Sequence, residues 1–140
     1  MSVSLTPRMK GWLETLGAHI AIADRQCVPT VVVVTQAQVA GATVTFALTS
    51  AQRNQTAKIL EENDQVAVAP GQLGSVRAPY QFKGSGRLQG DRLVVEVQEI
   101  YSTKPGPESA VRLDVMGQER MQRWEEARWT DLPPSGGPTG

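Results

Sequence analysis

The sequence has almost no cysteine or histidine, since Cys27 and His19 are the only residues of these types. One cysteine cannot form an internal disulfide, and one cysteine with one histidine makes no plausible set of zinc ligands. Nucleophilic catalysis would have to use His19, which lies in an apolar segment typical of a packed, structural histidine. Cys27 falls in a predicted turn without a feature that would activate its thiol. The sequence therefore predicts no metal site and identifies no catalytic residue.

An excess of charge of one sign is also absent, because 14 lysine and arginine residues balance 14 aspartate and glutamate residues. This balance argues against a dedicated nucleic-acid-binding protein, whose affinity comes mostly from neutralising phosphates. The longest strongly apolar stretch, residues 31–34, is far shorter than the roughly 20 residues that span a bilayer. The first residues lack a charged leader followed by an apolar run, so we expect no signal peptide and a cytoplasmic location.

What remains is the composition of an ordinary globular protein, with a hydrophobic fraction of 40% in 140 residues. A chain of this length can bury roughly 68–70% of its unfolded surface, which is enough for a core without metals or disulfides. We predict a single domain over residues 1–130. Residues 131–140 are mostly proline, glycine and serine, a composition that predicts a disordered tail.

Two stretches have the signals of helices. Thr6 followed by Pro7 is typical of a helix start, and Gly17 supplies an end. The apolar side chains between them fall on one face: Met9, Trp12, Leu13 and Leu16. A second helix is predicted over about residues 50–62. For residues 110–128 the sequence is compatible with either a strand or a helix. An alternating apolar pattern at 111–115 favours a strand, and the helical spacing that follows, up to about residue 128, favours a helix.

The rest of the chain reads as about six strands separated by turns. They are residues 18–24, 30–36, 43–48, 65–69, 80–89 and 92–101, the last two forming a hairpin around Gly90 and Asp91. Short turns without repeated helices between the strands predict an antiparallel meander or barrel rather than a parallel sheet. Gly84 and Gly86 predict either a bulge or the close approach of another group.

The helix at residues 50–62 has an unusual first turn. Helices usually carry acidic residues there, because exposed amides and the helix dipole favour negative charge. This helix begins with neutral donors and Arg53, and its first carboxylate is Glu61, near the opposite end. Such a turn would suit a bound phosphate. A solvated start with neutral capping residues explains the pattern equally well.

Taken in order, these elements resemble the FMN-binding split-barrel family of pyridoxamine 5′-phosphate oxidases and their small flavin-binding relatives, over about residues 13–107. Residues 46–50, leading through Arg53 and Thr56, resemble the strand-to-helix corner that holds the flavin phosphate. Residues 82–88 resemble the family's basic strand with its glycine. The resemblance implies a mainly β fold with short helices, a six-stranded antiparallel split β-barrel. It also implies a homodimer with FMN sites at the subunit interface.

The resemblance also assigns residues to the cofactor site. The phosphate would be held by Ser50, Arg53, Gln55 and Thr56. The wall beside the isoalloxazine ring would be Val33, Val34 and Thr35, and the partner subunit would contribute from Tyr80 to Lys83. Two positions depart from the family pattern: no lysine stands at or beside Gln55 or Thr56, and valines replace polar residues of the second strand.

Two classes of function follow from this reading. The first is a small FMN-dependent oxidoreductase or electron carrier, in which the cofactor performs the redox chemistry. The alternative is a non-enzymatic binding module on the same barrel, for a deazaflavin, haem or a protein partner. A lipocalin-like barrel for apolar ligands ranks lower, because it would not need the phosphate-type corner. Trp12, Trp124 and Trp129 are large apolar residues that could form an interface or the core.

Overall fold

The computed structural model describes residues 3–71, 78–104 and 106–128. Its strands are β1 (Ala18–Ala23), β2 (Pro29–Val34), β3 (Ala37–Ala40), β4 (Thr43–Ala47), β5 (Gln65–Pro70), β6 (Tyr80–Gln89) and β7 (Arg92–Ser102). The helices are α1 (Pro7–Leu16), α2 (Ser50–Glu62) and α3 (Gln118–Arg128). The helix predicted at 50–62 and the helix starting after Thr6 are confirmed. The predicted tail at 131–140 and Trp129 lie outside the described residues.

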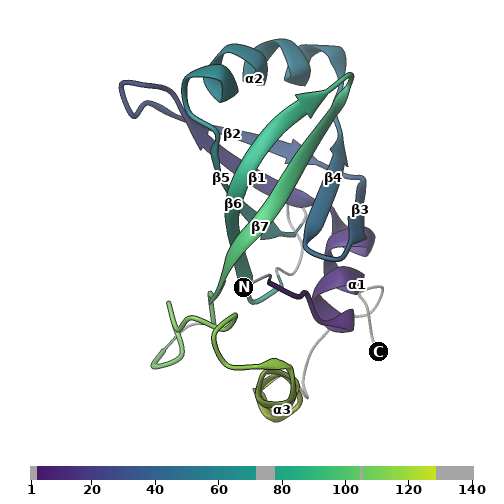
Figure 1. Ribbon diagram of the computed structural model, residues 1–140, viewed down its shortest axis with the longest axis vertical. Coiled ribbons are helices and arrows are strands. Elements are labelled where there is room, and N and C mark those ends of the chain that lie inside the picture. The colour runs from purple at the N-terminus through teal and green to yellow at the C-terminus, as the bar shows by residue number, and fades with distance from the viewer. Residues whose placement is uncertain (1–2, 72–77, 105, 129–140) are drawn as a thin grey trace.

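All seven strands belong to one sheet in the order β2-β1-β5-β6-β7-β4-β3, and neighbouring strands pair antiparallel. The sheet is strongly curled, with α2 across one end and α3 near the other (Figure 1). The sequence predicted six strands, and the additional one is β3. This four-residue strand pairs with β4, with Val39 opposite Val44. It is too short for alternation alone to reveal it.

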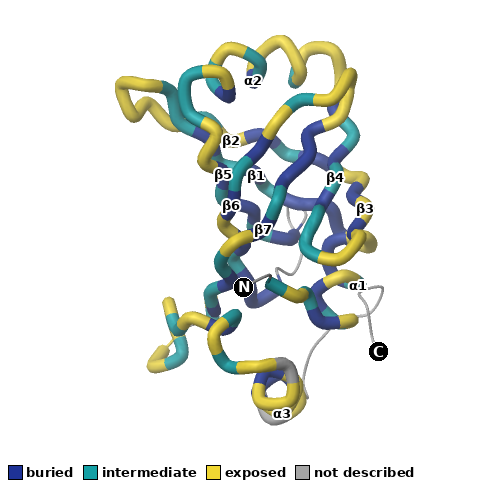
Figure 2. Tube along the Cα trace, viewed as in Figure 1, coloured by how far each residue is buried: buried dark blue, intermediate teal, exposed yellow. Residues whose placement is uncertain are grey.

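The core lies on the concave side of the sheet, because every second residue of each strand points there. Figure 2 shows these buried positions alternating with partly exposed ones along the strands. The predicted apolar face of α1 is buried in full: Met9, Trp12, Leu13 and Leu16. Trp12 and Trp124 are both buried, at 1% and 9% exposure. Both tryptophans therefore belong to the core of this chain.

The predicted irregularity in β6 is present. The pairing of β6 with β7 shifts register between Lys83 and Gly84. A Cβ atom at Gly84 would lie 1.9 Å from the Glu96 carbonyl oxygen, so only glycine lets the two backbones approach this closely. Both predicted features of this glycine are therefore observed, the bulge and the close approach, and the approaching group is the backbone of β7.

The segment after β7 is mostly non-regular until α3 begins. The alternating apolar pattern at residues 111–115 is compatible with a strand. In the structure, residues 110–115 form one isolated antiparallel β-bridge, between Tyr101 and Arg112, and no strand. The helical reading of the following residues is confirmed by α3, in which Met121 and Trp124 are buried. None of the helices formed by the described residues is long and apolar enough to cross a membrane.

Gly17 offers a test of how α1 joins the sheet. Its φ is +72°, and an added Cβ would lie 2.2 Å from the Val34 carbonyl oxygen. We predict that Gly17→Ala lowers the free energy of unfolding by about 2–4 kcal/mol, because backbone strain adds to a clash that cannot relax. Chemical denaturation measures the loss. The control is Gly41→Ala, which has a φ of +61° but no atom within 4 Å of the new Cβ. An equal loss in both variants would contradict the close approach at Gly17.

Candidate functional site

The first turn of α2 is built by a capping box. The Thr49 hydroxyl accepts a 3.1 Å hydrogen bond from the backbone amide of Gln52. In return, the side-chain Oε1 of Gln52 accepts a 3.0 Å hydrogen bond from the backbone amide of Thr49. The pattern Thr-x-x-Gln is a known signature of such a start. The first turn contains no acidic residue. The positive end of the helix dipole is therefore not neutralised by the helix's own carboxylates.

Gln52 also fastens α2 to the sheet. Its Nε2 donates a 2.7 Å hydrogen bond to the Val33 carbonyl oxygen of β2, a strand at the edge of the sheet. One side chain thus completes the helix cap and satisfies an edge-strand carbonyl. The contact brings together the two segments that the resemblance assigns to one site, residues 33–35 and residues 50–56. Gln52 itself was not among the predicted site residues, although its place in the capping-box pattern could have revealed it.

Within these segments the predicted residues differ in exposure. Ser50, Gln55 and Thr35 are exposed, Val33 is half-buried, and Val34 is buried in the core. Thr56 is buried, and its hydroxyl donates to the Gln52 carbonyl oxygen at 2.9 Å within the helix. Accessible donors are therefore offered by Ser50 and Gln55, while Thr56 is already paired inside α2.

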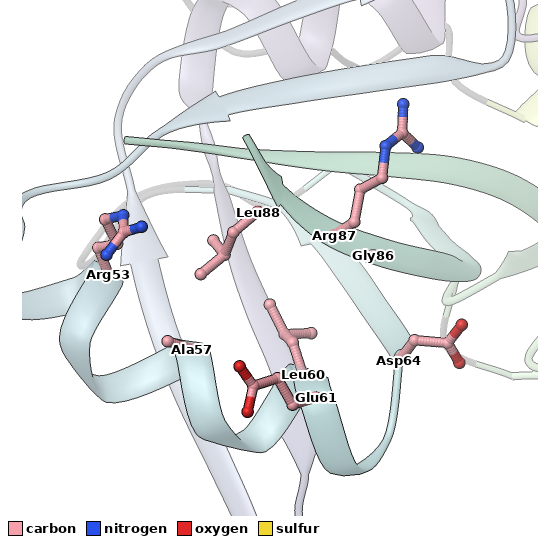
Figure 3. Close-up of a pocket in the computed structure, with 8 residues that line it drawn as sticks. All are labelled: Arg53, Ala57, Leu60, Glu61, Asp64, Gly86, Arg87 and Leu88. Carbon is pink, nitrogen blue, oxygen red and sulfur yellow. The ribbon is translucent and has the colours of Figure 1, made fainter. Parts of the chain in front are cut away.

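Arg53 points to the β6–β7 turn and not to β2. This turn lies beside the start of α2, since the Leu48 amide donates a 3.0 Å hydrogen bond to the Asp91 carbonyl oxygen. The Arg53 Nε donates a 2.6 Å hydrogen bond to the Gly90 carbonyl oxygen in the turn between β6 and β7. There Arg53 lines a cleft of about 450 Å³ between α2 and β6, whose apolar part is formed by Ala57, Leu60, Gly86 and Leu88. Arg53 and Arg87 lie toward opposite ends of this cleft (Figure 3). Glu61 lines the cleft from the same helix as Arg53, and Asp64 lines it just after that helix ends. Gln52 and Arg53 therefore bind different segments: Gln52 binds the Val33 carbonyl oxygen of β2, and Arg53 binds the Gly90 carbonyl oxygen.

Tyr80 and Lys83 lie on opposite faces of β6. Tyr80 points into the core at 0% exposure, and its hydroxyl donates to the Glu125 carboxylate. Burial and the adjacent carboxylate raise the pKa of Tyr80 far above its ordinary value, so the phenol stays protonated. Lys83 is exposed on the outer face, with its ammonium 4.8 Å from the centre of the Tyr101 ring. Only Lys83 of this pair faces outward in a single chain.

Beside Lys83 the outer face carries a shallow apolar groove of about 280 Å³. Its floor includes Ala21, Ala23 and Ala67, which are half-buried although they point away from the core. Further along, His19 lies on the same face, level with Val33 of β2 and Ala69 of β5. The three alanines present only small side chains on this part of the outer face. The apolar composition of these segments predicts strands but does not separate their two faces.

His19 is half-buried, and Cys27 is exposed in the β1–β2 turn, where its φ is +65°. In the described part of the chain, no cluster of histidine, cysteine, aspartate and glutamate has the composition of a metal site.

Similar solved structures share this arrangement of strands. Group A Streptococcus HupZ has a TM-score of 0.59 at 17% identity, covering 75% of this chain and 98% of HupZ. A candidate pyridoxamine 5′-phosphate oxidase from Lactobacillus delbrueckii has a TM-score of 0.57 at 8% identity, covering 71% of this chain and 94% of its own. The fold is a split barrel.

The predicted fold class is therefore confirmed, with seven strands in place of six. No family model and no curated protein sequence matches the chain. At identities of 17% and 8%, this similarity establishes the architecture of the chain and nothing of its cofactor or activity.

The Gln52 contact can be tested by separating its two roles. Gln52→Glu keeps the oxygen that caps Thr49 but loses the donor to Val33, so we predict a loss of about 1–2 kcal/mol in the free energy of unfolding. Gln52→Ala removes the cap as well and should lose more. The control is Gln55→Glu, an exposed change expected to stay within about 0.5 kcal/mol. Equal stabilities of Gln52→Glu and the wild-type protein in urea denaturation would show that the contact with β2 contributes nothing.

Proposed function

We propose that this chain is an FMN-binding split-barrel protein that acts as a homodimeric small oxidoreductase or electron carrier. The observation that carries the proposal is the Gln52–Val33 hydrogen bond. It holds the donor-rich start of α2 against β2, which is the arrangement that the split-barrel resemblance requires of a phosphate corner and a ring wall. When bound, FMN would supply the redox chemistry.

The residues at this corner suit a phosphate ester. Ser50 and Gln55 present a hydroxyl and an amide in the first two turns of α2, and both side chains are exposed. A phosphate there would accept hydrogen bonds in a positive helix-dipole field without meeting a carboxylate of that turn. The exposed Thr35 and half-buried Val33 would border the ring next to it. Arg53 would contribute its positive charge from the side of the β6–β7 turn, because its Nε is held by Gly90.

The outer face of the sheet supports a dimer. Ala21 lies level with Ala67, and Val31 is 58% exposed beside them. Small side chains in this position allow another sheet or chain to approach closely, and an exposed valine gains from being covered. Lys83 at the margin of the groove would then reach the site of the partner subunit.

Reconstitution with FMN tests the proposal. The purified wild-type protein should carry a flavin absorption spectrum or quench the fluorescence of added FMN. We predict that Gln55→Glu weakens FMN binding by about tenfold, since a carboxylate would face the phosphate. The matched control is Gln38→Glu on β3, an exposed position at the opposite edge of the sheet, which should leave affinity unchanged.

The same preparation separates the alternatives. Native mass spectrometry distinguishes a bound flavin from a different ligand or an empty site. Sedimentation at micromolar concentration should show a dimer with one FMN for each chain. A colourless protein that neither quenches FMN nor forms a dimer would leave the non-enzymatic binding module as the better account.

A further inference from the structure

The face of α2 that lines the cleft beside β6 carries opposite charges at its two ends. Arg53 stands near the start of the helix and Glu61 near its end, with Ala57 between them on the same face. Glu61 follows Arg53 by eight positions, which separates the two residues by about 12 Å along the helix axis. Asp64, just after α2 ends, lines the cleft at the same end as Glu61. The cleft therefore has a basic end and an acidic end.

Arg53 is a prepared anion-binding group. Its Nε donates a 2.6 Å hydrogen bond to the Gly90 carbonyl oxygen, which restrains the guanidinium and leaves Nη1 and Nη2 as further donors. Arg53 takes part in no salt bridge among the described residues. A guanidinium that is held at one nitrogen and open at the other two suits a carboxylate.

The acidic end of the cleft has an excess of negative charge. Arg87 is the cation at this end, and its Nη1 lies 3.5 Å from Glu96 Oε1. Glu61 and Asp64 are exposed, and within the part of the chain that the structure describes neither forms a salt bridge. With Glu96 included, three carboxylates stand against one guanidinium. This end of the cleft therefore suits an ammonium group.

Between its charged ends the cleft is apolar. Leu60 and Leu88 lie between Arg53 and Asp64 (Figure 3). Leu88 is half-buried, and Leu60 is nearly covered by the barrel. A volume of about 450 Å³ lies within the range of small-ligand sites. A ligand with an apolar middle would gain from covering these leucines.

We propose that this cleft binds a short peptide of about three residues with both of its termini free. The peptide's carboxylate binds Arg53, its ammonium group lies at Glu61 and Asp64, and its middle side chain rests on Leu60 and Leu88. An extended chain spans about 3.3–3.6 Å per residue, so three residues cover about 10 Å. This length matches the spacing of the charged ends of the cleft. The proposal does not rest on flavin binding.

Titration of the isotopically labelled full chain with the tripeptide Ala-Leu-Ala tests the proposal. We expect saturable shifts of the backbone amides of Ala57, Gly86 and Arg87, with little change at Ser50 and Gln55. Amidating the carboxylate or acetylating the amine of the peptide should each weaken binding by about five- to tenfold, since each removes one charged contact. The dipeptide Ala-Leu should also bind more weakly, because it is too short to reach both ends.

Variants assign each end of the peptide to its end of the cleft. In Arg53→Gln, the amidated and free peptides should bind alike. In the double variant Glu61→Gln, Asp64→Asn, the acetylated and free peptides should bind alike. The matched control is Lys58→Gln, an exposed position of α2 outside the cleft, which should keep every difference between the peptides that the wild-type protein shows.

Several outcomes would overturn the proposal. Equal binding of the free and blocked peptides by the wild-type protein, or no shifts in the cleft at high peptide concentration, would show that the charged ends recognise no peptide termini. A dipeptide that binds as tightly as the tripeptide would contradict the spacing. Arg53→Gln also loses the contact with Gly90. If this variant does not fold, the double variant and the dipeptide decide the question.

Discussion

The arrangement of the candidate site depends on the two hydrogen bonds of the Gln52 side-chain amide. This amide caps the start of α2 through its oxygen and binds the edge strand β2 through its nitrogen. Because both atoms of this amide are engaged, Gln52 sets the rotation of α2 about its axis together with the buried Thr56 and Leu60. That rotation leaves Ser50 and Gln55 exposed, buries Thr56, and sends Arg53 to the β6–β7 turn. The polar residues that the sequence assigns to one phosphate site therefore face different surroundings. Ser50 and Gln55 face solvent, whereas Arg53 binds the β6–β7 turn.

The curled sheet divides its own residues in a comparable way. Period-two alternation places Tyr80 in the core and Lys83 on the outer face of the same strand. The inner face buries large apolar side chains, whereas the outer face carries the small, half-buried side chains of Ala21 and Ala67. The two ends of the barrel differ as well, since α2 contributes neutral donors at one end and α3 contributes a buried acid at the other (Figure 1).

Local signals explain which features the sequence predicted well. The start of α1, the bounds of α2 and the β6–β7 hairpin follow from caps, turn residues and alternation within a few positions. The role of Tyr80 could not be foreseen in this way, because its partner Glu125 lies 45 residues further along the chain. The direction of Arg53 likewise depends on a carbonyl 37 residues away. Strand β3 escaped prediction because four residues carry too little pattern, and its pairing with β4 stabilises it.

We propose that an anionic cofactor binds where the start of α2 meets β2. An FMN titration of the isotopically labelled protein, followed through its backbone amide resonances, tests this claim most directly. We expect shifts concentrated at Ser50, Gln55 and Thr35, with little change at Asp64 and Arg87 in the cleft between α2 and β6. Shifts confined to Asp64, Arg87 and their neighbours, or no shifts at saturating FMN, would contradict this site.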